Sequence, residues 1–245
     1  MSEQIRPPTL AGVEDQRLPD PVPGGSSGAP CQAPAGFPQI EAVATTQIAT
    51  NSTSHVVNLP AGIVAGQLLL LIAGLDGVPT ISATGWTALT GASNTVAVRG
   101  LWRIADGSEG STVTVTSSAS EKAEYWVGRI SGAHASAAPE HTAAATGTAS
   151  ANIIKPAALT PSWGAANTLW IDIGNWDLSA GASIVSVSQP IRYIYLHEGT
   201  TGATDGCGLM LCEKWLNQAT ETLITEIELQ TGEQTSGMLV AVRPA

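Results

Sequence analysis

The feature that most constrains this sequence is a succession of short strand-like runs with almost no helical periodicity between them. Residues 112–116 read Thr-Val-Thr-Val-Thr, a strict alternation of β-branched side chains. Such alternation is typical of a half-buried β-strand, whereas an amphipathic helix repeats its apolar residues about every 3.6 positions. The best helical candidate, residues 120–123, is too short to form a stable helix. Other runs of strand composition, separated by Gly, Ser, Asn, Asp and Pro, lie at residues 68–73, 95–105, 124–131, 167–176, 184–188, 191–196, 208–216 and 237–243.

The strand-like runs also follow a similar order in the two halves of the chain. In each half an apolar run leads to an aspartate, at residues 67–76 and again at 168–177. A run with a tryptophan and a Glu-containing connector follows, then an amphipathic run, and then a last run that ends near Arg129 or Arg243. Many short strands with regular turn signals indicate a sandwich or a barrel. We therefore expect an all-β fold, a single jelly-roll-like antiparallel β-sandwich over residues 39–245 with an internal pseudo-repeat.

Residues 1–38 have a different composition and are expected to form an extended attachment arm. Eight of the 15 prolines of the chain lie here, with the run Gly-Gly-Ser-Ser-Gly at residues 24–28. Because proline fixes φ and lacks a backbone donor, this stretch cannot enter a helix or a sheet interior. It is either a disordered tail or an arm that orders along a partner protein, and we favour the arm. Its candidate partner-binding residues are Pro7, Pro8, Pro19, Pro21, Pro23, Pro30 and Pro34.

Charge and cysteine content exclude several classes of protein. The 10 Lys and Arg residues against 20 Asp and Glu give a net charge of -10, so we expect no nucleic-acid partner. The apolar stretch at residues 61–75 is shorter than the roughly 18 residues of a membrane-spanning helix, and no signal peptide is recognisable. The cysteines Cys31, Cys207 and Cys212 form neither a zinc motif nor a disulfide framework. Cys207 and Cys212 are separated by an odd offset, so on one strand they should face opposite sides.

The sequence carries no recognisable catalytic, cofactor or metal motif. The patterns GxGxxG, GxxxxGK[ST], HExxH and GxSxG are absent, and the four histidines are scattered. We therefore predict no catalytic residue, no cofactor and no metal, and we expect that the protein is not an enzyme. Because the chain has seven Trp and one Phe, tryptophan must supply most of the large aromatic core volume. Trp86 and Trp176 lie nearest the predicted loops and are candidates for stacking on a glycan.

Several segments together carry a resemblance to a known group of proteins. They are residues 59–71 (LPAGIVAGQLLLL), 85–89 (GWTAL), 102–110 (WRIADGSEG) and 128–132 (GRISG). In this order they resemble the opening segments of structural proteins of tailed bacteriophages. The resemblance covers residues 56–133 well and the remainder loosely, and the proline-rich arm lies outside it. It implies a jelly-roll-like β-sandwich on a virion, as a capsid decoration, a head fibre, or a tail or tail-fibre component.

These observations lead to one functional expectation and one alternative. We expect a virion protein, made in the cytoplasm of the bacterial host, that docks through its arm on the major capsid protein or a neighbouring virion subunit. Contacts between copies would give a homo-oligomer, with a trimer favoured. The alternative is a tail or tail-fibre component whose β-sandwich binds a host-surface glycan or receptor. An enzyme such as a polysaccharide depolymerase has the least support.

Overall fold

Every regular element in the described part of the chain is a β-strand, which confirms the predicted all-β class. The computed structural model describes residues 33–89, 96–142, 145–147, 153–177, 184–187, 192–197, 206–222, 226–230 and 234–245. The described strands all belong to one compact unit, Gln32–Ala245. This unit begins before residue 39, where we expected the domain to start, although the first strand does start at Gln39.

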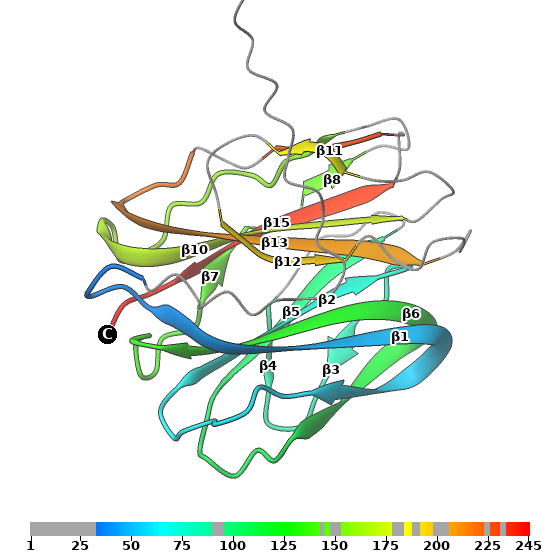
Figure 1. Ribbon diagram of the computed structural model, residues 1–245, viewed down its shortest axis with the longest axis horizontal. Coiled ribbons are helices and arrows are strands. Elements are labelled where there is room, and N and C mark those ends of the chain that lie inside the picture. Colours follow the sequence, from blue (N-terminus) through cyan, green and yellow to red (C-terminus); the bar gives the residue numbers. More distant parts are fainter. Residues whose placement is uncertain are drawn as a thin grey trace, which may run out of the picture. The chain divides into compact units, whose positions relative to one another are not determined.

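The strands form two large antiparallel sheets and one small one (Figure 1). The first sheet has the order β1-β6-β2-β5-β4, with β3 attached to β6, and the second has the order β12-β13-β10-β15-β7, with β8 attached to β15. The small sheet has the order β11-β14-β9. The strands are β1 (Gln39–Asn58), β2 (Leu68–Leu75), β3 (Ile81–Ser82), β4 (Thr87–Leu89), β5 (Ala97–Ile104), β6 (Thr112–Ser131), β7 (Glu140–His141), β8 (Ala145–Gly147), β9 (Ile153–Ile154), β10 (Ala166–Asp177), β11 (Ile184–Val187), β12 (Arg192–His197), β13 (Cys207–Gln218), β14 (Ile227–Leu229) and β15 (Thr235–Val242).

The two large sheets have the same strand order, so the internal repeat expected from the sequence is present in the topology. Strands β7, β15, β10, β13 and β12 take the places of β1, β6, β2, β5 and β4. The registers agree as well, because Leu70 lies opposite Trp102 on the neighbouring strand and Leu169 lies opposite Trp215. The first sheet comes only from residues 39–131 and the second only from residues 140–242. Each large sheet is therefore built from one half of the chain.

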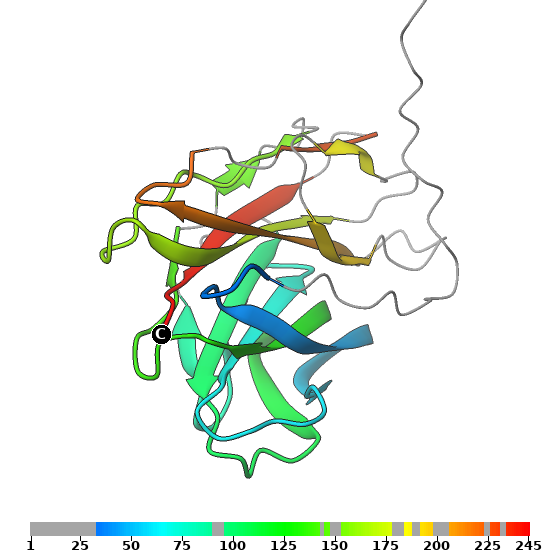
Figure 2. The same cartoon turned by 60° about the vertical axis from the view of Figure 1, so that its left-hand side comes forward.

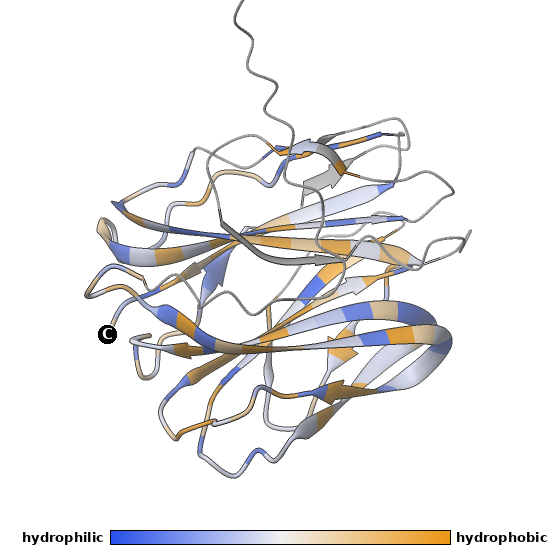
Figure 3. Cartoon of the chain, in the orientation of Figure 1, coloured by the Kyte–Doolittle hydropathy of each residue, from blue (hydrophilic) through white to orange (hydrophobic). Residues whose placement is uncertain are grey.

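A continuous apolar core lies between the two large sheets. Alternate residues of β2, namely Leu68, Leu70 and Ile72, belong to one buried cluster with alternate residues of β10 and β13. Figures 1 and 2 show the two sheets as stacked layers, and Figure 3 shows apolar residues along the strands of both. This packing covers one face of each sheet and makes the unit a β-sandwich.

The outer face of each large sheet carries a second apolar core under an additional layer. In the first half this layer is made by β3 and by the bent halves of β1 and β6, which are 20 residues long each. In the second half the small sheet takes its place, with its own buried cluster around Trp176. All eight residues of β2 are therefore buried, which explains its uninterrupted apolar sequence.

Two runs that the sequence separated are one strand in the structure, and the predicted orientation of the two cysteines on β13 is confirmed. The segments 112–116 and 124–131 belong to one strand, β6, which also contains the short helical candidate at residues 120–123. Register shifts in β1 between Ile48 and Ser54 let the paired strands bend there. The prediction that Cys207 and Cys212 face opposite sides is confirmed, because the Cys207 thiol donates to the Gly74 carbonyl of the first sheet and Cys212 packs in the outer cluster.

The C-terminus is tied to the junction between the two halves. Gln39 of β1 lies opposite Ser131 at the end of β6. The amide of Ala245 donates to the carbonyl of Gly132 at 2.9 Å, and the amide of His134 donates to the carbonyl of Arg243 at 2.9 Å. The start of β1, the midpoint of the sandwich and the C-terminus therefore meet at one place.

Candidate functional site

The two tryptophans predicted to stack on a glycan have different surroundings. Trp176 is fully buried in β10, and its ring lies directly over Gly208, where a Cβ atom would come within 2.1 Å of Cε2. Both of its ring faces are thus unavailable to a sugar, which corrects that prediction. Trp86 is half-buried between β3 and β4, where its amide donates to the Ala83 carbonyl at 3.1 Å. It follows Gly85, whose φ of 79° is one that glycine readily adopts.

The predicted partner-binding prolines fall mostly outside the described residues. Pro7, Pro8, Pro19, Pro21, Pro23 and Pro30 are in this group. Pro34 lies in a turn immediately before β1, where its carbonyl accepts a hydrogen bond from the Phe37 amide at 3.2 Å. The next residue after Phe37 is Pro38, and β1 begins at Gln39. Pro34 therefore belongs to the turn that leads into the first strand of the sandwich.

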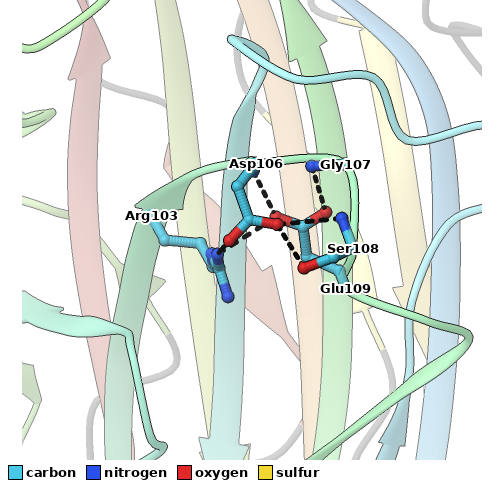
Figure 4. A network of polar contacts seen from close by, with 5 residues as sticks. All are labelled: Arg103, Asp106, Gly107, Ser108 and Glu109. Atoms are coloured by element: carbon cyan, nitrogen blue, oxygen red, sulfur yellow. Dashed lines mark hydrogen bonds and ion pairs between the residues drawn. The ribbon is translucent and has the colours of Figure 1, made fainter.

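A polar network organises the connection between β5 and β6 (Figure 4). The Glu109 carboxylate accepts hydrogen bonds from the amides of Asp106 at 2.6 Å and Gly107 at 3.0 Å, and it lies 3.1 Å from Arg103 Nη2. The Asp106 carboxylate accepts from the Ser108 amide and hydroxyl, and these bonds, with a smaller contribution from Arg103, lower the pKa of Asp106. Each carboxylate is directed at its own loop, so this network serves to hold the turn.

A buried hydrogen bond joins His55 of β1 to Tyr125 of β6 in the outer core of the first half. His55 Nδ1 and Tyr125 Oη are 2.6 Å apart, and His55 Nε2 lies 2.9 Å from the Ser52 carbonyl. Burial raises the pKa of the Tyr125 phenol, with a smaller contribution from the charge of Cys207. The pair is enclosed by the core, so we assign it a structural role at the bend of β1.

A buried cluster of charged side chains lies on the outer face of the second sheet. Lys214 Nζ of β13 is 2.8 Å from Asp172 Oδ2 of β10 and 3.8 Å from Glu221 Oε1. The Lys214 side chain is 9% exposed and the two carboxylates are 0% exposed. We call Asp172, Lys214 and Glu221 the buried triad. Sequence reasoning missed it because its residues are far apart in the chain and form no motif.

The first sheet ends at a long edge strand, β1. Within the described residues β1 pairs with β6 alone and ends the sheet order, so its other side has no neighbouring strand. Glu41 is its only Asp, Glu, Lys or Arg, and it exposes Val43 (47%) and Val56 (59%). We call this side of β1 and its exposed residues the β1 edge. The edge strand β4 at the opposite side of the same sheet has only 3 residues.

Neither a metal centre nor a membrane-spanning helix is present in the described part of the chain. Among those residues, no group of three or more His, Cys, Asp or Glu side chains is arranged to hold a metal ion. No helix in the described ranges has the length and apolar character needed to cross a membrane. Comparisons with protein-family models, with curated proteins and with solved structures gave no match to this chain. The fold and its surfaces thus define the chain as an all-β protein of two repeated sheets.

Proposed function

We propose that this chain is a non-enzymatic structural protein of a tailed-bacteriophage virion that decorates the capsid as a decoration or head-fibre protein. The sequence resemblance over residues 56–133 supports this proposal. In the fold, its motifs supply the buried strand β2 and the loop around Arg103, and glycines such as Gly62 and Gly85 with φ of 71° and 79°. These residues maintain the first sheet, as expected if a virion protein family preserves a fold rather than a catalytic centre.

The β1 edge is the observation that supports contact between copies of the chain. Soluble proteins protect exposed sheet edges with charges, prolines, bulges or short strands, because unpaired backbone groups recruit other strands. Strand β1 has register shifts at Ile40/Ala42 and between Ile48 and Ser54, but its pairing is regular from Ala42 to Ile48. Its one acidic side chain, Glu41, accepts a hydrogen bond from Ser131. Such an edge suits contact with a neighbouring copy of the chain in a cyclic oligomer, with a trimer favoured.

The proposed mechanism is mechanical. Residues 1–38 dock on the major capsid protein or on a neighbouring virion subunit, and the β1 edges join adjacent copies. Each contact buries surface that is available only in the assembled particle, so binding stabilises the assembly by mass action. The net charge of -10 agrees with a location on the virion exterior, away from the packaged genome. The protein is made in the cytoplasm of the bacterial host before assembly.

A single charge at the β1 edge tests the association. Val43→Lys places an ammonium group on the edge, and we expect a lower oligomeric mass by light scattering than for the unchanged chain. Val78→Lys is the matched control, because Val78 is also 47% exposed but lies in the connection after β2. If all three proteins have the same mass, whether oligomeric or monomeric, β1 is excluded as an oligomer contact.

Removal of the arm tests the attachment. A chain lacking residues 1–31, which leaves the sandwich unit from Gln32 intact, should fold with unchanged strand content by circular dichroism and should no longer occupy particles assembled without this protein. Occupancy can be counted by electron microscopy, which also distinguishes capsid positions from the tail. Equal occupancy with and without the arm would refute its proposed role.

A tail or tail-fibre component that binds a host-surface glycan is the second candidate function. The observation in its favour is Trp86, which is half-buried on a connection between β3 and β4 and is preceded by Gly85. A half-buried aromatic ring near a loop is a candidate for stacking on a sugar. Binding to host polysaccharide that is lost in Trp86→Ala would support this function, and no binding by either protein would exclude it.

A further inference from the structure

The buried triad has the composition and geometry of a group that can react with itself. Lys214 Nζ is in direct contact with Asp172 Oδ2 at 2.8 Å, and Glu221 Oε1 is 3.8 Å from the same nitrogen. An amine and a carboxyl group in contact are the two reactants of an amide bond. The third member is a carboxyl group, which is able to carry protons between them.

The sheet itself brings the reactants together. Strands β10 and β13 are antiparallel neighbours in which Asp172 lies opposite Cys212 and Lys214 lies opposite Trp170. Asp172 and Lys214 are therefore diagonal neighbours on one face of the sheet, at a separation that a lysine side chain spans. Both strands lie inside the second sheet, each flanked on both sides, so the pair has little freedom to separate.

Glu221 is held in position by contacts on both its backbone and its side chain. Its amide donates to the Leu159 carbonyl at 2.9 Å, and its own carbonyl accepts from the Leu159 amide at 3.3 Å. Its Oε2 accepts a hydrogen bond from Gln218 Nε2 at 2.6 Å, which leaves Oε1 directed at Lys214. A group fixed in this way can transfer protons repeatedly without rearrangement.

The surroundings favour an uncharged product. Trp170, Cys212 and Leu239 lie on the same face of the sheet and are fully buried. An ion pair in such surroundings loses the hydration of both charges, whereas an amide bond carries no charge. The amide bond can form only after one proton has passed from the ammonium group to the carboxylate, which leaves an amine in contact with a carboxylic acid.

We propose that Lys214 and Asp172 form an intramolecular isopeptide bond, with Glu221 as the proton carrier. Lys214 Nζ attacks Asp172 Cγ, the new N–C bond forms, and one C–O bond of the carboxylic acid breaks. Glu221 takes a proton from the nitrogen and delivers it to the departing hydroxyl, which leaves as one water molecule. No atom changes oxidation state, and no further reactant is needed.

The bond gives the second half of the molecule a covalent connection across its large sheet. It joins β10 to β13 and closes residues 172–214 into a covalent ring. A cross-link of this kind restricts the unfolded chain and resists force applied along the strands. This inference does not depend on the proposed virion role, because it concerns chemistry within one chain.

Mass spectrometry of the intact, denatured protein tests the proposal. We expect the matured protein to be lighter than its sequence by one water molecule, and digestion should yield one linked peptide pair containing residues 172 and 214. Lys214→Arg keeps the positive charge but should show neither the mass deficit nor the linked pair. Asp172→Asn should release ammonia instead of water and reach the same final mass as the reacted parent protein.

Control variants separate the buried triad from ordinary ion pairs. Lys155 and Glu226 form an exposed ion pair, so Lys155→Arg and Glu226→Gln should each retain the full mass deficit. Glu221→Gln should abolish the deficit, and a full deficit in this variant would overturn the role of Glu221. A parent protein with the full mass of its sequence, or a deficit that persists in Lys214→Arg, would overturn the isopeptide bond.

Discussion

The two halves of the sandwich share a strand order but build their outer layers differently. In the first half, β1 and β6 continue without a break from the large sheet into the outer layer. In the second half the corresponding path is divided, with β7, β8 and β9 in place of β1, and with β14 and β15 in place of β6. The same core between the two large sheets is therefore compatible with two different outer layers.

The halves also differ in the polar groups that they bury on those outer faces. On its outer face the first half buries the hydrogen-bonded pair of His55 and Tyr125 and the guanidinium of Arg99, which donates to the Pro79 carbonyl. The second half buries the triad of Asp172, Lys214 and Glu221. A continuous pair of strands supplies backbone hydrogen bonds that hold the first outer layer. The second outer layer has shorter strands, and we infer that side-chain contacts contribute more to holding it.

The largest expected effect is the loss of Lys214 in the second half. Lys214→Ala removes both the proposed isopeptide bond and the partner of the buried Asp172 carboxyl group, and it should lower the free energy of unfolding by about 3–5 kcal/mol. Lys155→Ala, at the exposed pair with Glu226, should cost at most about 1 kcal/mol. Urea denaturation of both variants gives the comparison. Equal, small effects would mean that the triad contributes no more than a surface ion pair.

The next prediction tests whether equivalent positions of the two halves fill equivalent volumes of the core between the sheets. The pair Trp126 and Gly128 on β6 occupies the places of Val240 and Val242 on β15 in the matched registers. A Cβ atom at Gly128 would lie 2.2 Å from Cη2 of Trp126, so Gly128→Val should cost about 3 kcal/mol.

The double substitution Trp126→Val with Gly128→Val should recover part of that loss, because it copies the valine pair of the second half. The recovery is read from a double-mutant cycle of urea midpoints. If the losses of the two single variants simply add in the double variant, positions 126 and 128 are not equivalent in core volume to positions 240 and 242.

A smaller effect is expected at the buried pair of the first half. Tyr125→Phe removes the hydroxyl that is 2.6 Å from His55 Nδ1 and leaves that nitrogen buried without this partner. The free energy of unfolding should fall by about 1–2 kcal/mol. Hydrogen exchange should locate the loss at the bend of β1 near residues 48–54 and leave β10 protected. Uniform loss of protection would contradict a local role.

The smallest expected effect is a difference between the two halves in how their stability depends on pH. Burial raises the pKa of the Cys207 and Cys212 thiols above the ordinary value of 9.0, and burial raises the pKa of Tyr125 above 10.0. The native groups keep their protons where the unfolded groups lose them, so stability is full below these ordinary values and falls as pH rises above them. The slope per group is at most about 1.4 kcal/mol per pH unit.

Because the cysteines lie in the second half, the loss should begin above about pH 9 there and only above about pH 10 at Tyr125. Thermal unfolding followed from pH 7 to 10.5 measures the slope, and Cys212→Ala should reduce it. A slope identical in Cys212→Ala would mean that this thiol remains protonated equally in both states.

The sequence predicted the strongly apolar elements and missed those defined by their environment. The run at residues 68–73 identified β2 because a strand buried on both faces needs apolar residues throughout. Strand β1 carries a weaker pattern of Ala, Thr and Ser, since only one of its sides has a partner strand. Trp176 follows a strand pattern that ends near a predicted turn, and only the additional outer layer shows that its ring is covered.

The candidate sites were harder to predict than the fold. Asp172 and Lys214 are each ordinary strand residues, and only the register between β10 and β13 brings them into contact. Glu221 was part of the repeated connector noticed in the sequence, but its burial depends on the bridge to Leu159. Sites made by pairing of distant strands leave no spacing signal, which is why motif searches did not reveal them.

The meeting of the chain ends with the junction between the halves means that the order of the halves along the chain is not essential to the architecture. Gln39 lies beside Ser131, and Ala245 is hydrogen-bonded to Gly132. A circularly permuted chain would start at residue 134 and run to residue 245. A short Gly-Ser linker would then lead to the segment that begins at Gln39 and ends at residue 131. This chain would keep every strand pairing within the two sheets. The molecule would then present its new termini where the two halves are now joined.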